Sequence, residues 1–247
     1  MALLGRTSLL EHFAALRSCL TRALLGWLAG VLVCYPFWER LWGLLLRPLY
    51  RVPKESLPQI VASTPVAAVS TSFHVSMLGG ALLASPWIAW QFWRFLSPAL
   101  HVRERQVLRS GAGFLFLNFL AGVAFGYLVL LPLILQWLVG FGRTLFTPMW
   151  SLDAYASLCL RFLLAVGLLF EWPLLTWSLA RAGLVTAAAL GRWWRYAVVG
   201  SFVLACFFVP PDPVSQSILA VPMVLLYLLG IWTARLGGRL HAAGKAS

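Results

Sequence analysis

YASLCLRFLLAVGLLFEWPLLTWSL, residues 155–179, is a run of 25 residues in which Arg161 and Glu171 are the only charged side chains. As a helix it would be about 37 Å long, enough to cross the roughly 30 Å hydrocarbon core of a bilayer. A carboxylic acid near the middle of such a run is costly to bury. Glu171 is therefore the first candidate for a functional residue.

The whole chain has the composition of an integral membrane protein. Of its 247 residues, 61% are hydrophobic and 11% are charged, whereas soluble domains average about 45–50% apolar and about 25% charged residues. Apolar runs of roughly 20 residues recur along the sequence, and the ten-residue alternation of barrel strands does not. We therefore expect an all-α integral membrane protein.

Hydropathy predicts six transmembrane spans that form a single membrane domain over residues 1–247. The spans are Leu20–Phe37, Phe73–Phe95, Ser110–Phe141, Tyr155–Leu179, Tyr196–Val209 and Val214–Thr233. The third is longer than a bilayer requires, so it must tilt, project or bend at Pro132. The fifth is too short for an unperturbed core, so it should thin the bilayer or lie against other helices.

The basic residues predict the orientation of the spans. If both termini are cytoplasmic, 13 of the 19 lysines and arginines lie inside, five lie outside, and Arg161 is within a span. This bias fits the positive-inside rule. Topology and contact with anionic membrane lipid thus explain the net charge of +12, with no need for nucleic acid. We expect a multi-pass protein of the cell's inner (cytoplasmic) membrane.

The polar residues do not predict an active site. The four histidines are isolated from one another and from the four cysteines, so neither a metal site nor a disulfide framework has the required spacing. The sequence has no G-x-S-x-G, H-E-x-x-H or phosphate-binding glycine motif, and its two aspartates, Asp153 and Asp212, fall at outer loops. We therefore expect no catalysis, cofactor or metal, which leaves recognition or transport.

The two charges within the fourth span cannot neutralise each other directly. Ten residues separate Arg161 from Glu171, which is about 15 Å along a helix and about 280° around it. Arg161 is close enough to the outer end to snorkel outward. Glu171 must face a wet cavity, bond to a partner or stay protonated. A bond to a neighbouring helix for packing alone is the structural alternative.

The loop after the second span, SPALHVRERQVLRS at residues 97–110, is rich in charge. Glu104 lies there among Arg103, Arg105 and Arg109. Its carboxylate could complement a helix N-terminus, or it could bind a cationic peptide through bidentate bonds to guanidinium groups. Composition leaves both possibilities open.

Six segments, taken in order, resemble the TatC family, the core receptor subunit of the twin-arginine protein translocase. They are LLEHFAALRSCL, RPLY, SPWIAWQFWRFLSPALHVRERQ, GYLVLLPL, LLFEWP and VPPDPVSQSILAVPM, and the resemblance runs from about Leu9 to Arg235. It implies a receptor for folded proteins whose N-terminal signal peptides carry two consecutive arginines. It also implies recruitment of single-span subunits of the TatA or TatB type, export driven by the proton-motive force, a concave glove-like arrangement of six helices, and assembly with further copies of the chain.

The same resemblance implies roles for eight residues. Signal binding at the cytoplasmic face would involve Glu104, Arg17, Phe95 and Arg103. Contact with a signal or partner helix in the membrane would involve Glu171 and Gln216. The outer cap or turn would be held by Pro48 and Asp212.

The amino-terminal segment departs from the family pattern. Many members have a second glutamate where this chain has Ala15, and the basic pair that follows Arg17 is replaced by Ser18 and Cys19. Glu11 is one helical turn earlier and could substitute in part if the segment is helical. The signal site should therefore be weaker, rely more on Glu104, or have a different preference.

Two other classes of function compete with this interpretation. A small-solute or ion transporter would use Glu171 as its coupling site, but the sequence lacks inverted repeats and paired broken helices. A membrane-embedded enzyme would need a nucleophile or a cluster of ligands that the sequence lacks. The sequence therefore favours a protein translocase subunit.

Overall fold

The computed structural model describes residues 2–52, 57–96, 105–141 and 148–246. Its helices are α1 (Ala2–Cys34), α2 (Trp38–Leu46), α3 (Ala67–Leu96), α4 (Arg105–Phe125), α5 (Leu131–Gly140), α6 (Leu152–Leu169), α7 (Trp172–Arg181), α8 (Ala187–Arg192), α9 (Trp194–Phe208) and α10 (Pro213–Ala246). Shorter elements are the 3-10 turns η1 (Tyr35–Phe37) and η2 (Leu49–Arg51), the π-helical turn η6 (Gly126–Leu130), and the strands β1 (Gln59–Val61) and β2 (Met149–Ser151).

Five helical segments of the described chain are long and apolar enough to cross a bilayer. They cover Phe13–Arg51, Ala67–Phe95, Gly111–Gly140, Leu152–Arg181 and Pro213–Arg239. A further apolar helix, α9, has only 15 residues, or about 22 Å. Large apolar side chains are exposed on the outside of the bundle, where lipid would cover them, for example Leu32, Phe207 and Leu225. The chain is a multi-pass helical membrane protein.

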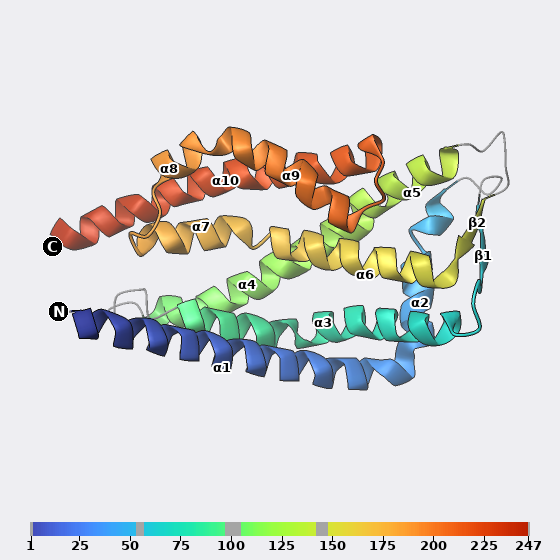
Figure 1. Cartoon of the computed structure of the whole chain (residues 1–247), viewed down its shortest axis with the longest axis horizontal. Coiled ribbons are helices and arrows are strands. Elements are labelled where there is room, and N and C mark those ends of the chain that lie inside the picture. Colours follow the sequence, from blue (N-terminus) through green and yellow to red (C-terminus); the bar gives the residue numbers. More distant parts are fainter. Residues whose placement is uncertain (1, 53–56, 97–104, 142–147, 247) are drawn as a thin grey trace.

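The first and last helices are longer than the spans predicted within them. α1 begins well before Leu20, and α10 continues well beyond Thr233. Hydropathy locates the apolar part of a helix, whereas the helix itself can continue into water without changing its hydrogen bonding. Both chain ends lie at one end of the bundle, and the strand pair lies at the other (Figure 1).

The long third span contains the π-helical turn η6. Pro132 has no N–H and cannot donate to the carbonyl of Leu128, four residues earlier. That carbonyl instead accepts a hydrogen bond of 3.2 Å from Nη1 of Arg51. The wider turn accommodates the proline ring and divides the span into α4 and α5, so the helix is irregular just before Pro132.

The end of α2 is held by two tyrosines from other elements. Tyr127 Oη donates to the carbonyl of Leu44, and Tyr155 Oη donates to that of Leu45, each at 2.6 Å. The carbonyl of Leu44 also accepts from the backbone N–H of Arg47 at 3.1 Å, and Pro48, the next residue, is fully buried. The tyrosines thus join the end of α2 to η6 and α6.

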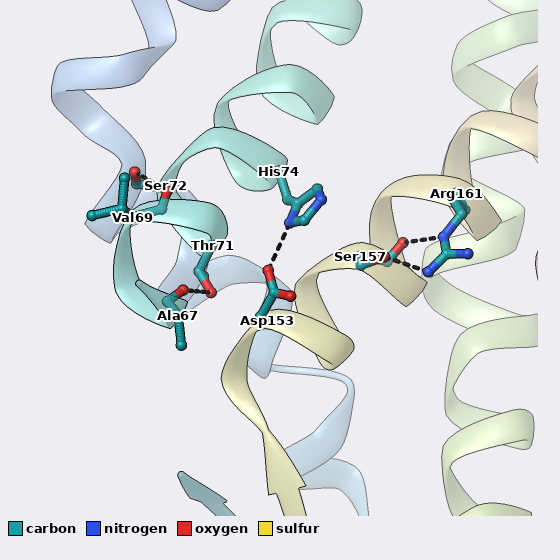
Figure 2. A network of polar contacts seen from close by, with 8 residues as sticks. All are labelled: Ala67, Val69, Thr71, Ser72, His74, Asp153, Ser157 and Arg161. Atoms are coloured by element: carbon teal, nitrogen blue, oxygen red, sulfur yellow. Dashed lines mark hydrogen bonds and ion pairs between the residues drawn. The ribbon is translucent and has the colours of Figure 1, made fainter. Parts of the chain in front are cut away.

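The end of the bundle opposite the chain termini is held together by contacts between loops and helices. β1 and β2 are parallel, with Ile60 opposite Trp150. His74 Nδ1 on α3 lies 3.2 Å from Asp153 Oδ1 in the first turn of α6, which joins these two helices (Figure 2). The strand pair and this contact together connect segments that are far apart in sequence.

Two glycines allow α1 and α3 to pack closely. A Cβ atom on Gly80 would lie 2.5 Å from the backbone nitrogen of Val31, and one on Gly30 would lie 2.6 Å from the carbonyl oxygen of Gly80. Both distances are too short for carbon against backbone, so only glycine fits. Small residues at such crossings are the usual means by which membrane helices approach each other.

Replacing Gly80 by valine should therefore force α1 and α3 apart and destabilise the protein by about 1–3 kcal/mol. The thermal unfolding midpoint of the protein in detergent measures this loss. Gly113→Val in α4 is the matched control, because nothing lies within 4 Å of the added Cβ atom there. Equal losses in the two variants would show that helix propensity, and not the close crossing, sets the effect.

Candidate functional site

The span that contains Glu171 is not one continuous helix. α6 ends at Leu169 and α7 begins at Trp172. Pro173 has no N–H to donate to the carbonyl of Leu169, which explains an interruption at this place. Glu171 occupies the N-cap position of α7, but its side chain makes no capping hydrogen bond. The carboxyl group therefore does not hold the helix start in place.

Glu171 lines an apolar cavity that opens on the surface of the bundle, since Leu24 and Leu168 in its wall are exposed. The cavity has a volume of about 670 Å³ and is bounded by α1, α3, α4, α6 and α7. Its apolar wall includes Leu24, Ile88, Phe119 and Leu168. Among the described residues that line it, Glu171 is the only ionisable one. An apolar segment with one polar group would match this wall.

Two buried polar atoms on residues that line this cavity have no hydrogen-bond partner within the described part of the chain, Oε2 of Glu171 and Nε1 of Trp172. Nε1 of Trp172 lies against Gly230 of α10, where an added Cβ atom would be 2.8 Å from it. The hydroxyl of Ser85 in the same wall is satisfied, because it donates to the carbonyl of Leu82 at 2.6 Å. A buried polar atom without a partner costs about 1–3 kcal/mol. An incoming helix with a polar side chain would recover part of that cost.

The cavity extends toward the end of the bundle where both termini lie. Phe95, near the end of α3, lines it, as does Leu20 of α1. Arg17 is exposed three residues before Leu20 and on the same side of α1. Glu104 and Arg103 lie outside the described residues. The structure thus brings Phe95 and Glu171 to one cavity, with Arg17 near its edge.

Asp212 and Gln216, two other residues predicted to have functional roles, do not line the Glu171 cavity. Oδ2 of Asp212 accepts from the backbone N–H of Ser215 at 2.7 Å and from Nε1 of Trp137 at 3.0 Å. Since Pro213 is the first residue of α10, Asp212 acts as its N-cap and ties the start of α10 to α5. Gln216 is half-buried in the next turn and does not line the Glu171 cavity.

Sequence reasoning did not identify Trp172 or the cavity. The signal for the helix break was present, because a proline two residues after Glu171 disfavours a continuous helix. The cavity has no such signal, since its wall comes from five helices that are distant in sequence. Within the described residues, no group of three or more His, Cys, Asp or Glu side chains could hold a metal ion.

A break beside a membrane acid is also a feature of ion transporters, in which discontinuous helices form the binding site. The geometry of Glu171 alone therefore does not separate a transporter from a protein translocase subunit. Similarity to known proteins distinguishes these two classes.

The similarity extends over nearly the whole chain. The family model for "Sec-independent protein translocase protein (TatC)" matches residues 11–222. The protein of that name from Desulforapulum autotrophicum is 34% identical over 229 residues, which are 93% of this chain and 84% of that protein. The one from Helicobacter pylori is 33% identical over 225 residues, 91% of this chain and 88% of that protein. A solved crystal structure of the twin-arginine translocase receptor TatC matches with a TM-score of 0.84 at 31% identity, covering 92% of this chain and 99% of that one.

Proposed function

We propose a mechanism from one premise: this chain belongs to the TatC family of Sec-independent protein translocase proteins. It is a receptor subunit of the twin-arginine translocase, a transport protein and not an enzyme. In the proposed mechanism, the chain binds a signal peptide in two parts. Two arginines bind at the cytoplasmic face, and the apolar part that follows them enters the Glu171 cavity.

The observation that carries this proposal is the cavity that reaches from Phe95 to Glu171. Phe95 is close in sequence to Glu104, the acid that would bind the arginines. An apolar segment leaving Glu104 would therefore meet the Phe95 end of the cavity first. Further inside, the unpartnered Oε2 of Glu171 could bond to a polar group on the segment or on a partner helix.

The orientation in this proposal follows from charge. Thirteen basic residues fall on the side of the termini and five on the other, which favours cytoplasmic termini in the inner membrane. Both termini lie at the same end of the bundle, as an even number of crossings requires (Figure 1). We therefore count α9 as the sixth crossing of one concave, glove-like membrane domain.

The partners in the proposal are of three kinds. Single-span subunits of the TatA or TatB type would contact the start of α10 near Gln216, and further copies of this chain would join the same receptor complex. Pro48 and Asp212 would maintain the outer cap and the turn that present this surface, which is supported by the buried position of Pro48 and the hydrogen bond that Asp212 accepts from Ser215. Folded cargo would bind through its signal peptide.

The proposed recognition depends on the shape of arginine as well as its charge. A guanidinium group presents paired N–H donors that match a carboxylate, whereas a lysine ammonium is a point charge. Arg17 and Arg103 would help to position the carboxylate of Glu104 rather than bind the signal arginines directly, because like charges repel.

A photo-cross-linker at Gln106, two residues from Glu104, tests this function in the purified chain. We expect a strong adduct with a signal peptide that carries two arginines and a weak one with the same peptide carrying two lysines. The matched peptides have equal charge, so the difference isolates the guanidinium geometry. Equal labelling by both would count heavily against the recognition site. Proton-coupled uptake of a small solute by the chain alone would instead support a transporter.

A further inference from the structure

We propose that Arg161 binds the phosphate group of a phospholipid from the outer leaflet, in a second cavity on the outside of the helix bundle. This cavity has a volume of about 520 Å³ and lies between α5, β2, α6 and the end of α9. Arg161 is on one wall, and Pro210 and Pro211 of the turn between α9 and α10 are on another. The cavity is thus separate from the one that contains Glu171.

Among the described residues, the guanidinium group of Arg161 hydrogen-bonds only to Ser157. Its Nε donates to the carbonyl of Ser157 at 3.4 Å, and its Nη2 donates to the Ser157 hydroxyl. No other hydrogen bond or ion pair of Arg161 is found among the residues that the structure describes. The side chain is exposed and lies alongside α6 toward its outer end, as snorkelling requires (Figure 2).

The two aspartates at this end of the molecule contact residues other than Arg161. Asp153 pairs with His74 on α3, and Figure 2 shows it on a different side of α6 from Arg161. Asp212 accepts hydrogen bonds from Trp137 and Ser215. Within the described chain, Arg161 therefore lacks an anionic partner at a depth where an unpaired cation is costly.

The short helix α9 explains how a lipid headgroup can reach this depth. Arg161 is nine residues after the start of α6, or about 14 Å along the helix. The turn between α9 and α10 ends short of the outer ends of α5 and α6 (Figure 1). The bilayer beside the short α9–α10 hairpin must become locally thinner to match the length of α9. The outer headgroups would then lie level with the turn, whose prolines line the Arg161 cavity.

The chemistry of the cavity fits a phospholipid better than a free ion. A guanidinium fork matches the oxygens of a phosphate group. The rest of the wall includes Leu138, Leu158 and Phe207, which would contact acyl chains and give a small hydrated anion no benefit. The occupant is therefore an amphiphile with a phosphate headgroup.

Native mass spectrometry of the whole chain, released from a neutral detergent to which phosphatidylglycerol is added, tests the proposal. We expect one tightly retained lipid on the unchanged chain and on the order of tenfold weaker retention for Arg161→Gln, since one charge-assisted contact is lost. Arg161→Lys should be intermediate, because it keeps the charge and loses the fork. Arg235→Gln, which removes an exposed arginine near the opposite end of the bundle, should bind like the unchanged chain.

Three further arms can overturn the inference. Equal retention of diacylglycerol, which has no phosphate, would mean that the apolar wall alone binds lipid. Protection of the site by inorganic phosphate at a concentration equal to that of the lipid would indicate a simple ion site. Unchanged lipid retention by Arg161→Gln, together with loss of a co-purified single-span subunit, would assign the cavity to a protein partner. The unfolding midpoint of each variant, expected to be unchanged, excludes misfolding as the cause.

Discussion

Replacing Glu104 by glutamine should lower the affinity for a signal peptide with two arginines by about ten- to a hundredfold. A charge-assisted hydrogen bond contributes about 1.5–3 kcal/mol, and about 1.4 kcal/mol corresponds to a factor of ten. Glutamine keeps one acceptor oxygen but loses the charge and the second acceptor. The effect should be large in this chain because Ala15 replaces the other acid expected of the family. Fluorescence anisotropy of a labelled peptide with the purified protein measures it.

Glu39→Gln is the matched control for that experiment. Glu39 is an exposed acid on α2, away from the end of the bundle that contains the chain termini, so the same change in charge should leave peptide affinity unaltered. A peptide with two lysines should bind weakly to the unchanged protein and lose little more in Glu104→Gln, since interacting groups do not contribute additively. Equal losses for the arginine and lysine peptides would show that only net charge matters, which contradicts bidentate binding.

Much of the fold follows from hydropathy. A bilayer leaves backbone groups without water, so long apolar runs such as residues 73–95 must be helical, and their order gives the topology. A bend at Pro132 was one of three alternatives for the long third span, and the structure has the π-helical turn η6 just before that residue, where the missing N–H interrupts the regular hydrogen bonding. The small parallel strand pair was not predicted, since three-residue strands in loops have no periodic signal.

The candidate site was predictable only in part. Glu171 was identified because a carboxylic acid is rare and costly at that depth. Its cavity could not be predicted, because packing between helices leaves no trace in local composition. The hydrogen bonds from Tyr127 and Tyr155 to the end of α2 were also missed, as their partners are 83 and 110 residues away in sequence. Hydrogen bonds between residues so far apart in sequence can be identified only from the structure.

Replacing Glu171 by leucine should have opposite effects on stability and on function. In the isolated chain, Oε2 of Glu171 is buried without a hydrogen-bond partner. An apolar side chain of similar size removes that desolvation cost, so the unfolding midpoint should stay the same or rise, by up to about 1–3 kcal/mol in free energy. Capture of the signal or partner helix should weaken roughly five- to thirtyfold, because hydrogen bonds between membrane helices contribute about 1–2 kcal/mol.

Two matched changes separate this recognition role from a structural one. Ser85→Ala removes a hydroxyl from the same cavity wall, but that hydroxyl already bonds to Leu82, so helix capture should not change. Glu171→Gln keeps hydrogen-bonding atoms and should retain part of the capture, as read from cross-links between a probe at Leu24 and the helix. If Glu171→Leu instead lowered the unfolding midpoint and left the cross-link intact, the carboxyl group would be holding the α6–α7 break in place. An unchanged or higher unfolding midpoint of Glu171→Leu, together with a weaker cross-link to the helix, is the result that identifies Glu171 as a contact for the signal or partner helix.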